Sequence, residues 1–123
     1  MKTVNYPSQD MIDTQPSEEL LSRTIKIIET YISDPGLNGY RLSRELGISK
    51  RVLYVRLKNL AGQTVNEFIR TTRLKKSIHY ISEGKFNISQ ISIEMGFNSV
   101  SYFIRSFKKH FGLSPRAYIK QKL

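Results

Sequence analysis

Residues 91–118 read ISIEMGFNSVSYFIRSFKKHFGLSPRAY, and this stretch decides the fold. Apolar residues at helical spacing lead into Gly96, and a second helical segment follows the turn. That second segment carries cations on its other sides and aromatic residues on one side, namely Tyr102, Phe103, Phe107 and Phe111. The pattern is typical of a helix-turn-helix whose second helix is basic on its outer face.

A similar block lies about fifty residues earlier in the chain. Residues 42–48 align on residues 91–97 at an offset of 49, and after the turn Leu53 and Leu57 match Phe103 and Phe107 at an offset of 50. Gly47 and Gly96 stand where a sharp turn between helices needs a left-handed backbone. One block could belong to any helical hairpin. Two blocks in register, each with a cationic and acid-free second helix, favour a pair of helix-turn-helix units. With only two copies, a solenoid is not expected.

The rest of the chain predicts further helices and no strands. Ser17 is the expected N-cap of a helix running to about residue 33, with an apolar stripe formed by Leu21, Ile25, Ile28 and Ile32. Thr64 and Glu67 have capping-box spacing and open a long helix that ends before Gly84. Nothing alternates with a period of two over a useful length. We therefore predict an all-α fold of seven helices.

This reading divides the chain into four parts. Residues 1–16 are polar and aperiodic, and they are expected to be a disordered linker or a remnant of recombinant expression. Residues 17–63 form a first helix-turn-helix subdomain, residues 64–83 a linker helix, and residues 84–123 a second subdomain.

The charge distribution indicates a polyanionic partner. The net charge is +10, but residues 1–34 hold three basic residues against six acids, whereas residues 35–123 hold seventeen against four. Such a balance suits nucleic acid, although charge alone does not separate DNA, RNA and an acidic membrane. A soluble protein that is merely basic on its surface is the simpler alternative.

Several other classes are disfavoured by composition. The chain has no cysteine, which excludes disulfides and thiolate zinc sites and fits a reducing cytoplasm. No apolar run is long enough for a membrane span, and no signal-peptide core is present. His79 and His110 lie far apart, and the acids of the basic portion are scattered. We expect no metal, no cofactor and no enzymatic activity.

The second block resembles the signature of the AraC/XylS family of bacterial transcription regulators. The matching residues are Gly96, Phe97, Tyr102, Phe103, Arg105, Phe107, Lys108, Lys109, Gly112, Ser114, Pro115 and Tyr118. The resemblance covers about residues 18–120, and it departs from the family at Ser92, where alanine is usual, and at Val65. The amino-acid sequence around Glu67–Lys75 is most similar to the C-terminal output domains of hybrid two-component sensor/regulators. The resemblance implies duplex-DNA binding, transcription control, contact with RNA polymerase and an upstream sensor or receiver domain.

A long helix between the two units gives a geometry for reading DNA. About 18 residues at 1.5 Å per residue span roughly 27 Å, and successive major grooves on one face of a duplex lie about 34 Å apart. The two second helices could therefore enter adjacent grooves.

Inward positions on each recognition helix leave a set of outward side chains. Leu53, Leu57 and Leu60 are expected to face inward in the first helix, and Phe103 and Phe107 in the second. The candidate base contacts are then Lys50, Arg51, Tyr54, Val55, Ser99, Val100, Ser101, Ile104 and Arg105. Arginine can bond guanine through two hydrogen bonds, whereas Val100 and Ile104 could read only apolar features such as thymine methyls. The resemblance implies base contacts at Arg51, Tyr54, Val100, Ser101 and Arg105.

A second set is expected to hold the DNA backbone. The candidate phosphate contacts are Ser49, Lys58, Asn87, Lys108, Lys109, Ser114 and Arg116, some of them at helix N-termini. About half of the lysines are expected to be plain solvated charges. Arg70 and Arg73, on the long helix, are expected to be structural and to pair with Glu45, Glu67 or Glu94.

Two alternatives remain beside sequence-specific DNA binding. The chain could be a general basic domain that binds nucleic acid or protein without sequence specificity, although its cations do not follow one continuous amphipathic face as a membrane-binding helix requires. It could also be a purely structural or protein-binding helical domain. Within the DNA-binding reading, the chain could be a complete short regulator or, as fits slightly better, a monomeric fragment of a larger receptor.

Overall fold

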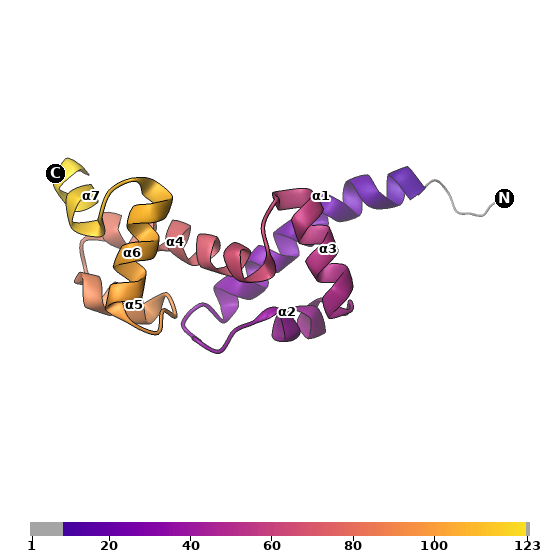
Figure 1. Cartoon of the computed structure of the whole chain (residues 1–123), viewed down its shortest axis with the longest axis horizontal. Helices are drawn as coiled ribbons and strands as arrows, with labels where there is room; N and C mark the ends of the chain where they lie inside the picture. The colour runs from indigo at the N-terminus through magenta and orange to yellow at the C-terminus, as the bar shows by residue number, and fades with distance from the viewer. Residues whose placement is uncertain (1–8, 123) are drawn as a thin grey trace.

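The chain folds into seven helices, as the sequence predicts. The computed structural model describes residues 9–122, with side chains from residue 18 onward, and within that range it contains no strand (Figure 1). The helices are α1 (Gln9–Thr30), α2 (Gly39–Leu46), α3 (Lys50–Ala61), α4 (Val65–Glu83), α5 (Ile88–Glu94), α6 (Val100–Phe111) and α7 (Pro115–Lys122).

Helix α1 is longer than the sequence predicts. It begins at Gln9 instead of after Ser17, so the expected linker has helical backbone from residue 9 onward, and residues 1–8 lie outside the described range. Residues 9–15 contain neither glycine nor proline, so the segment before Pro16 has no strong helix breaker. The buried stripe of α1 also differs, because Leu20, Thr24 and Ile28 are buried whereas Ile25 is 37% exposed.

Side chains cap most of the helices at the positions that the sequence indicates. The capping box at α4 is complete: Glu67 N–H donates to Thr64 Oγ1 at 3.1 Å, and Thr64 N–H donates to Glu67 Oε1 at 2.9 Å. Asn87 and Gln90 make a second box at α5, which the sequence analysis did not anticipate. These caps satisfy backbone donors that the first turn of a helix leaves free.

Two apolar clusters stabilise the fold. The first core lies among α1, α2, α3 and the start of α4, and its fully buried members include Ile28, Leu42, Leu53 and Leu57. The second core lies among the end of α4 and the helices α5 and α6, with α7 packed against it. Phe107 is central there, because its ring packs against three others, those of Phe103, Phe111 and Tyr118.

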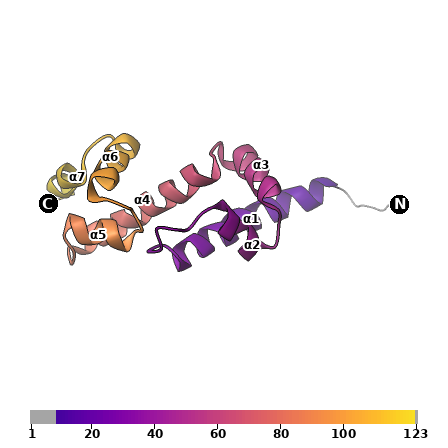
Figure 2. The ribbon, with the colours of Figure 1, turned by 60° about the horizontal axis from the view of Figure 1, so that its bottom comes forward.

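Helix α4 belongs to both cores and links them. Its first half contributes Val65, Phe68 and Ile69 to the first core, and its second half contributes Leu74 and Ile81 to the second. With 19 residues, α4 spans about 28 Å. Figure 2 shows α4 running between the two groups of helices, with α3 near its N-terminal end and α6 nearer its C-terminal end. No helix in residues 9–122 has the length and apolar character needed to cross a bilayer.

Candidate nucleic-acid interface

Helix α3 presents a largely exposed outer face. Ser49 caps it by accepting a hydrogen bond from Val52 N–H at 3.1 Å. Leu53 and Leu57 are fully buried, so the helix is fixed on the first core by an i, i+4 pair. The four candidate base readers of this helix are all exposed, namely Lys50, Arg51, Tyr54 and Val55. The inward orientation predicted for Leu60 is wrong: its side chain is 37% exposed.

Helix α6 is held in the same way but presents a mixed face. Ser99 caps it, and Phe103 and Phe107 are fully buried. Ser101 and Arg105 are exposed, whereas Val100 and Ile104 are only half-exposed. Ile104 also packs against the second core, because a position one residue after Phe103 still touches its neighbouring helices. The apolar pair therefore offers less free surface than the sequence suggests.

The candidate phosphate contacts fall into two kinds. The cations Lys58, Lys108, Lys109 and Arg116 are exposed. The side-chain oxygens of Ser49, Asn87 and Ser114 instead cap their own helices, each accepting a backbone N–H three residues on. In addition, Asn87 N–H already donates to Gln90 Oε1 at 3.0 Å. Any anion at these termini would therefore meet the remaining backbone donors and not the cap residue's side chain.

A groove lies between the two helix-turn-helix units. It encloses about 660 Å³ and is lined by the connection between α3 and α4, one face of α4 and one face of α6. Arg70, Arg105 and Lys109 border it, with Glu67 as the acidic residue among the lining groups. The excess of positive charge suits an anionic backbone passing between the recognition helices.

Among the described residues, neither Arg70 nor Arg73 forms a salt bridge with the predicted glutamates, although the charge of Arg70 helps to lower the pKa of Glu67. Arg70 Nη1 donates to the hydroxyl of Tyr102 at 3.2 Å, and Arg73 Nη2 donates to the backbone carbonyl of Asp34 at 2.6 Å. Glu67 is committed to the capping box, and its pKa lies below the usual value chiefly because its carboxylate accepts the backbone N–H of Thr64. The structural role expected of Arg73 is supported, since it is only 8% exposed and burial lowers the pKa of its guanidinium.

Two helix-turn-helix units joined by one long helix, each with an exposed cationic second helix, define a two-headed DNA-binding domain. A family model described as a helix-turn-helix domain matches residues 42–121. The chain belongs to this family, as an AraC-type DNA-binding domain. The family and fold are those of transcription regulators and not of enzymes.

Two curated relatives are longer proteins that contain a similar segment. The chain is 38% identical over 101 residues to histidine kinase P4 of Formosa agariphila, a match that covers 82% of this chain and 7% of that protein. It is 35% identical over 78 residues to the transcriptional activator AggR of Escherichia coli, covering 63% of this chain and 29% of the relative. The chain thus spans less than a third of either relative.

Solved structures share the fold over most of the chain. An AraC-type regulator from Chromobacterium violaceum superposes with a TM-score of 0.79 at 23% identity, covering 88% of this chain and 96% of that one. The C-terminal domain of the two-component response regulator YesN from Fusobacterium nucleatum gives a TM-score of 0.70 at 26% identity, covering 85% and 98%.

Proposed function

We propose that this chain binds double-stranded DNA sequence-specifically, with α3 and α6 in two successive major grooves, and regulates transcription as the output domain of a two-component regulator. The observation that carries the proposal is the placement of two acid-free recognition helices with exposed outer faces at the two ends of one helix about 28 Å long. That length is close to the groove repeat of about 34 Å along one face of the duplex.

Each helix-turn-helix unit, called a head below, has an arginine suited to reading guanine. Arg51 in α3 and Arg105 in α6 are exposed, and a guanidinium can donate two hydrogen bonds to guanine O6 and N7. The other proposed base contacts surround these arginines on the two helices, namely Lys50, Tyr54, Val55, Ser99, Val100, Ser101 and Ile104. Because Val100 and Ile104 are half-buried, their part in recognition is limited to apolar contact with thymine methyls or deoxyribose.

The cations around the heads hold the phosphates. Lys58, Lys108, Lys109 and Arg116 are exposed, and the free backbone donors in the first turns of α3, α5 and α7, which follow Ser49, Asn87 and Ser114, add contacts. These groups set position and overall affinity, since a phosphate carries no sequence information.

The regulatory context follows from the relatives. A histidine kinase and a transcriptional activator contain a similar segment, and a response regulator ends in the same fold. We therefore place this domain downstream of a sensor or receiver domain in a bacterial cytoplasm, acting as a monomeric DNA-binding unit that contacts RNA polymerase.

Selection of bound sites from a random duplex library tests the proposal. The expected result is an asymmetric motif in two parts that covers about two helical turns and survives competitor DNA at physiological salt. Enrichment of no motif, with binding that vanishes as salt rises, would instead support a basic domain without sequence specificity.

A further inference from the structure

A buried arginine joins the linker helix to the first head. Arg73 lies on α4, and its Nη2 donates to the carbonyl of Asp34, in the connection between α1 and α2, at 2.6 Å. This hydrogen bond links positions 39 residues apart. Burying a guanidinium costs several kcal/mol unless hydrogen bonds compensate for the lost water. Among the described residues, no protein group accepts a hydrogen bond from Arg73 Nε. The Asp34 carbonyl is thus the protein acceptor that the structure shows for this buried cation.

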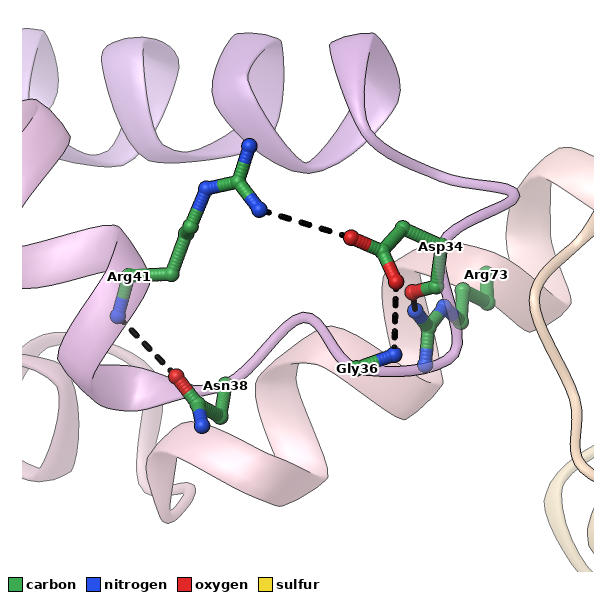
Figure 3. Close-up of polar contacts among 5 residues, drawn as sticks. All are labelled: Asp34, Gly36, Asn38, Arg41 and Arg73. Carbon is green, nitrogen blue, oxygen red and sulfur yellow. Dashed lines mark hydrogen bonds and ion pairs between the residues drawn. The ribbon is translucent and has the colours of Figure 1, made fainter.

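The Asp34 carbonyl that accepts from Arg73 lies in a loop whose conformation is fixed by side-chain hydrogen bonds (Figure 3). The Asp34 carboxylate accepts Gly36 N–H at 2.8 Å and pairs with Arg41 at 3.4 Å. Asn38 caps α2 by accepting Arg41 N–H at 3.0 Å, which anchors the other end of the loop. The acceptor of Arg73 is therefore fixed to the first head through side-chain contacts as well as through the chain.

The turn between α5 and α6 lies close to the same contact between Arg73 and the segment that follows α1. Gly96 has φ +79°, and a Cβ added there would overlap the carbonyl oxygen of Ile32, two residues after the end of α1, and lie 2.8 Å from Arg73 Nη2. Gly47 occupies the same place in the first repeat with φ +73°, yet a Cβ added there would meet nothing within 4 Å. Both glycines serve their turns, but only Gly96 also allows close contact between the two halves of the molecule.

We propose that the Arg73–Asp34 and Gly96–Ile32 contacts lock the second head against the first, and so determine which spacing between two half-sites the chain accepts. The inference rests on the two-headed binding proposed above. If α4 alone joined the two heads, it could bend and twist and so change their relative orientation. With the Arg73–Asp34 and Gly96–Ile32 contacts in place, such a movement would break those contacts. One added base pair moves a half-site by about 3.4 Å and turns it by roughly 35°. A locked pair of heads cannot follow that change.

Three substitutions test this lock, with a library of duplexes randomised over about three helical turns as the probe. Arg73→Met removes the hydrogen bonds and keeps much of the side chain's volume. Gly96→Ala forces the two halves apart. Gly47→Ala is the matched control, since it carries the same strain of about 1–2 kcal/mol for a left-handed backbone without the contact.

The expected result separates the variants by spacing selectivity and not by affinity. The wild type and Gly47→Ala should enrich one spacing, whereas Arg73→Met and Gly96→Ala should also enrich sites one base pair longer or shorter. Arg73→Lys, which keeps the charge and can still donate to Asp34, should restore most of the selectivity. The same single spacing for the wild type and all four variants would overturn the inference, with circular dichroism confirming that each is folded.

A measurement on the free protein keeps this test separate from the proposed function. Residual dipolar couplings report the orientation of α6 relative to α3 without DNA. The lock predicts that the couplings of both heads in the wild type fit one fixed relative orientation. In Arg73→Met, the couplings of one head should be smaller than those of the other, because the two heads move independently. An unchanged orientation in that variant would refute the lock. A loosened orientation together with no two-part site for the wild type would refute the two-headed function and leave the lock standing.

Discussion

Replacing Phe107 by alanine should unfold one head and leave the other folded. The ring is fully buried and packs against three other rings, with centroid distances of 5.8, 4.6 and 5.9 Å. Truncating a buried phenylalanine to alanine costs about 3–5 kcal/mol. At about 0.05–0.15 kcal/mol per residue, the roughly 40 residues of the second subdomain hold about 2–6 kcal/mol of stability. The loss thus equals most of what the second core provides.

Native-state hydrogen exchange measures this directly. In Phe107→Ala, amide protection should fall in α5, α6 and the second half of α4, while α2 and α3 keep theirs, because the two cores share no buried residue. Leu57 is the matching position of the first repeat and is equally buried, so Leu57→Ala should give the mirror result at a cost of about 2–5 kcal/mol. Equal loss of protection in both heads from either variant would refute the separation of the two cores.

Four further outcomes follow from single residues. Arg105→Ala should lose roughly 1–3 kcal/mol on the selected site and relax preference at one base pair, and equal losses on random DNA in a shift assay would contradict base reading. Lys108→Ala should weaken all sequences alike and reduce the salt dependence of log K by about 0.9, measured by titration at several salt concentrations. Thr64→Ala should cost about 1 kcal/mol in urea unfolding, and a cost near zero would mean that its cap does not stabilise α4. The pKa of Glu67 is lower in the folded state than its usual 4.5, so its stabilising contribution is present above that pH and is lost as the pH falls through the folded value. Glu67→Gln should therefore flatten this part of a curve of unfolding free energy against pH. An unchanged curve would exclude Glu67 as the source of the dependence.

The sequence predicted the interior of each head well. Repeated apolar positions such as Leu53 and Phe103 define inward faces, because a helix brings residues three and four apart onto one side. Caps were predicted for the same local reason, since Thr64 and Glu67 interact within one turn. Errors arose where exposure depends on a neighbouring helix, as for Leu60, which is exposed, and Ile104, which is half-buried.

The contacts between the heads could not be predicted in this way. Arg73 was expected to pair with a carboxylate, yet it meets a backbone carbonyl 39 residues away, and Arg70 meets the hydroxyl of Tyr102 32 residues away. Every residue has a backbone carbonyl, so residue types do not indicate which carbonyl a buried cation will find. The N-terminal extension of α1 was also missed, because residues 9–16 have no apolar period.

The sequence by itself determined the two repeated helix-turn-helix units, their caps and the cationic outer faces, since periodicity, capping and charge act over a few residues. Tertiary structure alone decided how the heads are set relative to each other. Gly47 and Gly96 are equivalent in sequence, with nearly equal φ angles, and only the packed chain shows that one faces open space and the other faces the segment that follows α1. The reason is that the contact depends on how α1, α4 and the second turn meet in space, which no local pattern specifies.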